Sequence, residues 1–141
     1  METATRPYAF SRKVFCEGMR DGVPIALGYF AVSFSLGIAA RKAGLTPVQG
    51  FFASLLNNAS AGEYAAFALI ASGATYLEVA IITLIANARY LLMSCALAQR
   101  FAPGTPFFHR LIIGYDVTDE LFGITIARPG WLNPFYTYGA I

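Results

Sequence analysis

Ionisable residues stand inside stretches of this chain that are otherwise apolar enough to cross a bilayer. They are Glu63, Arg89 and the adjacent pair Asp119 and Glu120. A charge at the centre of a membrane helix costs roughly 2.5–3.5 kcal/mol on insertion scales, so such residues rarely face lipid and often line a substrate or ion path. The sequence therefore predicts a multi-pass membrane protein with a polar site in its interior.

The composition agrees with a chain embedded in a membrane. Of the 141 residues, 57% are hydrophobic and 13% are charged, against about 25% charged in soluble domains. The formal net charge of +2, with no basic stripe interleaved with aromatic residues, argues against binding to nucleic acid. Cys16, Cys95 and His109 do not have metal-ligand spacing, and no nucleophile motif is present. We therefore expect no metal, no cofactor and no enzymatic activity.

The apolar stretches predict an all-α fold, a polytopic membrane helix bundle of about four spans plus the start of a fifth. Residues 1–22 are expected to form an N-terminal tail and an amphipathic interfacial helix, or else a first helix turn that merges into the next span. Residues 23–141 are expected to form the transmembrane helical domain, with Asp21 as N-cap of its first helix. The predicted spans cover about residues 23–40, 48–71, 76–98 and 111–127.

The two ends of the chain give further expectations. Four basic residues precede the first span, which favours a cytoplasmic N-terminus by the positive-inside rule. The fifth apolar run begins at Trp131 and stops at Ile141, although a membrane span needs about 20 residues. We therefore expect the chain to be the C-terminally truncated front part of a longer protein.

The second predicted span is interrupted in its middle. Residues 57–64 read Asn-Asn-Ala-Ser-Ala-Gly-Glu-Tyr, and Asn, Ser and Gly are poor helix formers. Unwound backbone at membrane depth is tolerated only where protein or water surrounds it, and broken helices of this kind build the sites of many transporters. The alternative is a continuous helix whose small residues pack against neighbouring helices. Both interpretations turn this face towards the protein interior.

The fourth predicted span is too acidic to be a lone helix in lipid. Its eight Leu, Ile, Val and Phe residues favour insertion by roughly 4 kcal/mol in total, whereas its acids oppose insertion by roughly 8–10 kcal/mol. These acids are Asp116, Asp119 and Glu120, which share one face of a helix because they are three and four residues apart. We expect that face to point into the protein.

Five stretches of the chain form a recognisable set in a fixed order: residues 22–30, 43–47, 59–64, 87–94 and 118–122. Together they resemble the AzlC family of membrane permeases, the large subunits of branched-chain amino acid exporters. The resemblance implies a multi-pass protein of the prokaryotic cytoplasmic membrane that exports hydrophobic amino acids such as Leu, Ile, Val or Met. It also implies a small, hydrophobic AzlD-type partner subunit. Many members have a neutral Gln in place of Glu63, a difference that bears on the substrate or the coupling ion.

A zwitterionic amino acid needs one partner for its carboxylate, another for its ammonium group, and an apolar pocket for its side chain. Arg89 offers a bidentate fork for the carboxylate. Glu63, or the pair Asp119 and Glu120, offers a partner for the ammonium group. We expect these groups to converge near the middle of the membrane. The candidate binding or coupling residues are Asn58, Ser60, Gly62, Glu63, Asn87, Arg89, Thr118, Asp119 and Glu120.

Other interpretations of the same residues remain open. The acids can serve as proton carriers instead of substrate partners. Arg89 can pair with Glu63 or Asp119 only to let the helices assemble, without contact to a substrate. In that case the chain is a membrane scaffold or assembly subunit that transports nothing, or an inactive fragment of a transporter.

Overall fold

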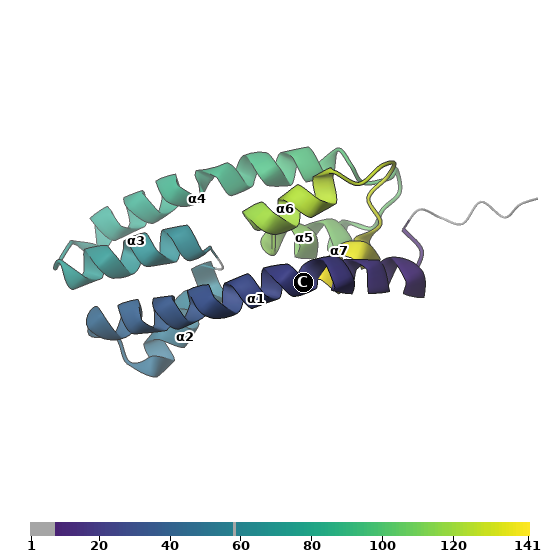
Figure 1. Cartoon of the computed structure of the whole chain (residues 1–141). Helices are drawn as coiled ribbons and strands as arrows, with labels where there is room; N and C mark the ends of the chain where they lie inside the picture. The colour runs from purple at the N-terminus through teal and green to yellow at the C-terminus, as the bar shows by residue number, and fades with distance from the viewer. Residues whose placement is uncertain (1–7, 58) are drawn as a thin grey trace, which may run out of the picture. The chain divides into compact units, whose positions relative to one another are not determined.

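The computed structural model describes residues 8–57 and 59–141, and within them the chain forms seven helices and no strand (Figure 1). The predicted all-α class is confirmed. Within the same residues, α1 and α4 are the two helices long and apolar enough to cross a membrane. The helices are α1 (Arg12–Lys42), α2 (Pro47–Asn57), α3 (Ser60–Ala71), α4 (Tyr76–Ala98), α5 (Phe107–Tyr115), α6 (Asp119–Ile126) and α7 (Pro134–Ala140).

Helix α1 is continuous from the basic N-terminal segment into the first apolar run, with Pro24 inside it. The structure therefore has the merged helix that was one of the two alternatives for this region. Asp21 lies within α1, so the expectation that it caps the helix is wrong. Its carboxylate instead accepts a hydrogen bond of 2.8 Å from the Tyr136 hydroxyl. The Asp21 carboxylate is therefore engaged in a tertiary contact with α7 and does not cap a helix start.

The described residues divide into two compact units. One unit contains the chain up to Ala26 and from Leu92 onwards, and the other contains Leu27–Leu91. Helices α1 and α4 each contribute residues to both units, because the boundaries fall inside them. The short helices α2 and α3 lie in the Leu27–Leu91 unit. The short helices α5 and α6 lie in the other unit.

In the Leu27–Leu91 unit, the expected interruption of the second apolar run is present. Helix α2 ends at Asn57 and α3 begins at Ser60. The Ser54 hydroxyl donates a hydrogen bond of 3.2 Å to Glu63, although residues nine apart in a straight helix are separated by about 13.5 Å along its axis. A straight continuation of α2 into α3 is therefore excluded, and the two helices pack against each other.

The buried core of this unit is formed by Leu36 and Ala40 of α1 together with Phe67 of α3. Four smaller or partly buried apolar side chains pack around them, including Ala53 of α2. Burial of these apolar surfaces fixes the α2–α3 pair against the C-terminal half of α1.

In the other unit, the predicted fourth span is also a helix pair, so the expectation of one helix over residues 111–127 is wrong. Helix α5 ends at Tyr115, and α6 begins at Asp119 after the N-cap residue Thr118, whose side chain accepts a hydrogen bond from the Leu121 amide. The threonine cap and two acids in the first turn favour a new helix start at this point. Asp116 follows the end of α5, so the three acids do not share one helix face.

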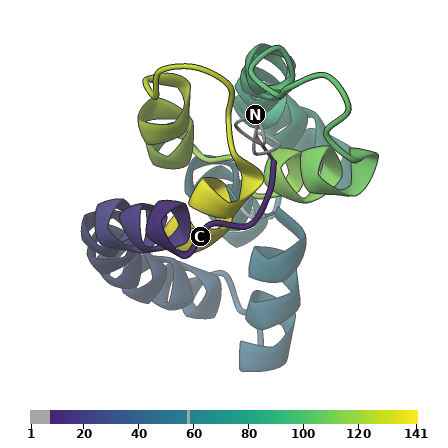
Figure 2. The same ribbon diagram turned by 90° about the vertical axis from the view of Figure 1, so that its right-hand side faces the viewer.

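Helix α7 lies beside the N-terminal turns of α1 (Figure 2) and contacts α5 and α6. The loop before α7 is tied to the loop after α4, because the Leu132 amide donates a hydrogen bond of 2.7 Å to the Arg100 carbonyl. Tyr136, Ile113 and Leu132 are each about 1% exposed. They form the buried centre of this unit.

The two helix pairs begin in the same way. The first begins with Thr46-Pro47, and Thr105-Pro106 stands at the start of the second. A glycine in the left-handed region precedes each start, Gly44 and Gly104, both with φ of 84°. Glycine adopts this conformation without the steric cost that a Cβ atom brings. The same turn chemistry therefore introduces both interrupted segments.

Candidate functional site

Glu63 is a buried carboxylate in the first turn of α3. Its residue is 5% exposed, and the Ser54 hydroxyl on α2 donates to its Oε2 at 3.2 Å. Burial of a carboxylate is costly unless hydrogen bonds or a positive charge compensate for it. The hydroxyl of Ser54 is a neutral donor, so it compensates for only part of this cost. The arrangement suits a carboxylate that meets a cation or a proton during function.

A cavity of about 400 Å³ lies next to Glu63, formed by α1, α2, α3 and the turn before α2. Its lining includes the apolar side chains of Leu36, Phe51 and Phe67 as well as the polar side chains of Glu63 and Ser54. The Arg41 guanidinium, which donates from Nη1 to the Leu45 carbonyl at 2.8 Å, also lines it. All of these residues belong to the Leu27–Leu91 unit. The lining residues are Ser33, Leu36, Gly37, Ala40, Arg41, Thr46, Pro47, Gly50, Phe51, Ser54, Glu63 and Phe67.

A second polar cluster joins the α2–α3 pair to α4. The Asn87 side-chain amide donates a hydrogen bond of 2.7 Å to Asn57 Oδ1. The same amide packs directly on Gly62, where an added Cβ atom would lie 2.9 Å from Asn87 Cγ. Among the described residues, Asn87 Oδ1 is buried without a hydrogen-bond partner. The structure therefore brings together Gly62 and Asn87, two of the residues predicted from sequence.

We expect Gly62→Ala to lower stability by about 1–3 kcal/mol, because the new methyl group overlaps the Asn87 amide. The measurement is thermal unfolding of the purified protein in detergent. Gly28→Ala is the matched control, since a Cβ atom there meets nothing within 4 Å. Adding Asn87→Ala to the Gly62→Ala variant should restore part of the loss. An unchanged unfolding temperature for Gly62→Ala would contradict the close packing.

The remaining candidates of the Leu27–Leu91 unit lie elsewhere in it. Arg89 is exposed, donates a hydrogen bond of 3.2 Å to the Tyr90 hydroxyl, and lies 5.1 Å from the centroid of the Tyr90 ring. Ser60 is half-buried at the start of α3. Asn58 is outside the described residues.

The three candidates on α6 and its cap belong to the other unit. Thr118 is buried and caps the helix, and both acids stand in the first turn. Asp119 is half-buried and Glu120 is exposed. The expected convergence of these residues with Glu63 and Arg89 stays a prediction.

Sequence reasoning missed Arg41 and Ser54 as neighbours of Glu63. Arg41 is followed by Lys42 at the end of an apolar run, a pattern typical of an interfacial anchor. Ser54 is a single polar residue in an apolar stretch. Its position just before the interruption is the one sequence feature that indicates a role at the site. In the part of the chain that the structure describes, no group of three His, Cys, Asp or Glu side chains is arranged to hold a metal ion.

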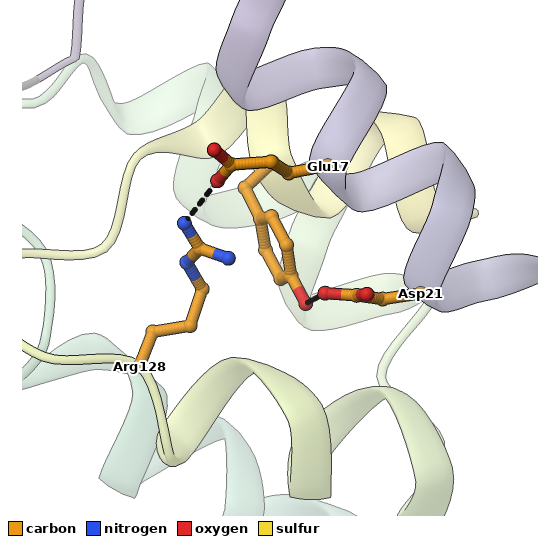
Figure 3. A network of polar contacts seen from close by, with 4 residues as sticks. Glu17, Asp21 and Arg128 are labelled. Carbon is orange, nitrogen blue, oxygen red and sulfur yellow. Dashed lines mark hydrogen bonds and ion pairs between the residues drawn. The ribbon is translucent and has the colours of Figure 1, made fainter.

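Sequence reasoning also missed a polar network in the other unit (Figure 3). Arg128 pairs with Glu17 at 2.7 Å and lies 3.9 Å from the centroid of the Tyr136 ring, whose hydroxyl donates to Asp21. Burial alone lowers the pKa of Arg128, but its hydrogen bond to Glu17 and its contact with Tyr136 raise that pKa above the ordinary value. Arg128 therefore stays cationic. The network joins residues up to 115 positions apart, so no local pattern reveals it.

Comparisons with known proteins agree with a membrane protein. A family model described as AzlC protein matches residues 24–141. Inner membrane protein YgaZ of Escherichia coli (strain K12) is 27% identical over 128 residues, which cover 91% of this chain and 52% of that protein. An uncharacterized membrane protein of Archaeoglobus fulgidus is 29% identical over 113 residues, covering 80% and 49%. The chain spans about half the length of the curated relatives it matches. No solved structure matches it.

Proposed function

Because this chain belongs to the AzlC family of membrane proteins, we propose that it is a permease for hydrophobic amino acids such as Leu, Ile, Val or Met. The direction we propose is export across the prokaryotic cytoplasmic membrane. Within the described residues, α1 and α4 are long and apolar enough to cross a membrane, which supports a membrane location. The relatives are named as membrane proteins, which supports a membrane location as well.

The observation that best supports transport is the buried carboxylate of Glu63 beside a cavity with an apolar wall. A hydrophobic amino acid presents an ammonium group next to an aliphatic side chain, and the cavity offers a partner for each. Leu36 and Phe67 supply apolar surface, and Glu63 supplies the negative charge. The interruption between α2, which ends at Asn57, and α3, which begins at Ser60, also fits a transporter, because interrupted helices bring polar groups to membrane depth.

We also propose that a small hydrophobic AzlD-type subunit accompanies this chain. The argument comes from the family and from large apolar side chains on α1 that are exposed in the structure. Leu27, Phe30 and Phe34 are 69–75% exposed. Such side chains need lipid or another apolar helix beside them.

We expect the whole protein, reconstituted into vesicles with this partner, to move radiolabelled leucine across the membrane. In Glu63→Gln the carboxamide keeps the size of the side chain but removes its charge. We expect the rate of leucine transport to fall by about tenfold or more, since a hydrogen bond to a charged group contributes roughly 1.5–3 kcal/mol. The measurement is the initial rate of leucine flux.

Glu78→Gln is the matched control for this experiment. Glu78 accepts hydrogen bonds from the Thr75 amide and hydroxyl, at 2.7 and 2.9 Å, in a capping box at the start of α4, and glutamine serves equally well in such a box. Normal flux in Glu63→Gln at every pH tested would exclude Glu63 as ammonium partner and as proton carrier. Absence of flux in the wild-type protein, with and without the partner, would favour the scaffold function.

A further inference from the structure

We propose that the cavity formed by α1, α2 and α3 binds the whole amino acid zwitterion, with Arg41 as the partner of the substrate carboxylate. This inference rests on the proposed function and deepens it, because it assigns both charged ends of the substrate to one cavity. It also replaces Arg89 in the role that the sequence suggested for it. All residues involved belong to the Leu27–Leu91 unit.

The first argument is the combination of groups around the cavity. Arg41 and Glu63 are its charged lining residues, and they have opposite signs. Leu36, Phe51 and Phe67 supply apolar surface in the same lining. A molecule with a carboxylate, an ammonium group and an aliphatic side chain matches this combination. An amine without a carboxylate, or a carboxylic acid without an amine, satisfies only one of the two charges.

The second argument is the geometry of Arg41. Its Nη1 donates to the Leu45 carbonyl at 2.8 Å, which holds the guanidinium in the turn that follows α1. A guanidinium has five N–H donors in a fixed fork, so donors suitable for a carboxylate remain after this bond. A cation is also favoured at the C-terminal end of a helix by the helix dipole. Arg41 is therefore a fixed positive group at the cavity.

The third argument concerns Arg89. Its guanidinium lies against the Tyr90 ring and donates to the Tyr90 hydroxyl, and Arg89 is not among the described residues that line the cavity. Arg41 lines the same cavity as Glu63, whereas Arg89 does not. For a substrate whose carboxylate and ammonium group share one carbon atom, this difference favours Arg41.

The fourth argument is size. A volume of about 400 Å³ lies within the range of roughly 300–1,000 Å³ that small-molecule sites occupy. Gly37 opens part of this space, since a Cβ atom there meets nothing within 4 Å. A Cβ atom can therefore be added at Gly37, which lines the cavity, without a clash. We expect a larger side chain at this position to compete with a bound ligand.

The test measures binding of radiolabelled leucine to the purified whole protein and competition by two analogues. Leucinol lacks the carboxylate, and 4-methylpentanoate lacks the ammonium group. In the wild-type protein we expect both analogues to compete about tenfold or more weakly than leucine, because each loses one charge-assisted contact.

Two variants that each remove one charge, Arg41→Gln and Glu63→Gln, should each abolish the preference for leucine over one of the two analogues. In Arg41→Gln we expect leucine affinity to fall by about tenfold or more, while leucinol affinity is unchanged. In Glu63→Gln we expect leucine affinity to fall while 4-methylpentanoate affinity is unchanged. Lys42→Gln is the control for Arg41, since Lys42 is the next cation in the chain and is not among the described lining residues. It should leave the affinities unchanged.

A third variant tests whether leucine binds in this cavity, and it changes no charge. Gly37→Phe should abolish leucine binding while the thermal unfolding temperature is retained. Gly28→Phe should bind leucine normally, because Gly28 has the same open surroundings but does not line the cavity among the described residues.

Two results would overturn the inference while the proposed function stands. One is normal leucine binding and export in Arg41→Gln and Gly37→Phe. The other is an equal loss of leucine and leucinol affinity in Arg41→Gln, which would indicate general damage and no carboxylate contact. A wild-type protein that neither binds nor exports any hydrophobic amino acid would instead overturn the proposed function, and this inference with it.

Discussion

Tyr136→Ala is expected to lower the free energy of unfolding by about 3–5 kcal/mol, the range for removing a fully buried aromatic side chain. Tyr136 is 1% exposed in α7. Its ring lies beneath the Arg128 guanidinium, and its hydroxyl donates to Asp21 on α1. The substitution therefore leaves a cavity and also removes partners from two charged groups. Thermal unfolding of the purified protein in detergent measures the loss.

Two further variants separate the causes of this effect. Tyr136→Phe keeps the ring and removes only the hydroxyl, so we expect a loss of about 1–2 kcal/mol from the hydrogen bond to Asp21. Tyr76→Ala is the control, because Tyr76 is 96% exposed, and it should change stability little. If Tyr136→Ala were as stable as Tyr76→Ala, the burial of α7 against α1 would be wrong.

The second large effect is expected for Gly18→Ala, with a loss of about 2–3 kcal/mol. A Cβ atom at Gly18 would overlap the carbonyl oxygen of Tyr136, and it would lie 3.0 Å from the carbonyl carbon. The obstacle is backbone, so no side-chain rotation can relieve it. Gly22 is packed in the same way against Ala140, and Gly139 against the Phe15 carbonyl. Small residues four apart allow this close approach of two helices.

Gly28→Ala gives the opposite sign and serves as the control. Nothing lies within 4 Å of a Cβ atom at Gly28, and replacing a glycine inside a helix by alanine stabilises it by roughly 0.5–1 kcal/mol. Both variants are measured by thermal unfolding under the same conditions. Equal stability of the Gly18→Ala and Gly28→Ala proteins would contradict the close packing of α1 against α7.

Helix bounds were predicted best from the sequence where local residues determine them. Helix α4 has the predicted bounds, Tyr76–Ala98, because a continuous apolar run follows a Thr75–Glu78 capping box. Helix α1 has the merged form that was one of two alternatives for this region, and Asp21 lies inside it, where its carboxylate contacts Tyr136 on α7 and caps no helix start. The break between α5 and α6 was missed because the threonine cap at Thr118 was not recognised.

The same distinction applies to the candidate site. Glu63 was found because a single charge in an apolar run is visible in sequence. Its neighbour Ser54 and the guanidinium of Arg41 are evident only in the folded structure, in which α2 and α3 pack against each other. The ion pair of Glu17 with Arg128 joins residues 111 positions apart. Such a pair depends on tertiary folding, and pattern or propensity along the chain does not contain it.

The lengths of the short helices have a consequence for biosynthesis. Helices α2, α3, α5 and α6 have 11, 12, 9 and 8 residues, whereas about 20 are needed to traverse the hydrocarbon layer. The polar groups at their broken ends also cannot face acyl chains. During translation, α2 and α3 emerge from the ribosome before α4. We therefore expect the nascent pair to enter the membrane packed on α1, which emerges first and shares a buried core with the pair.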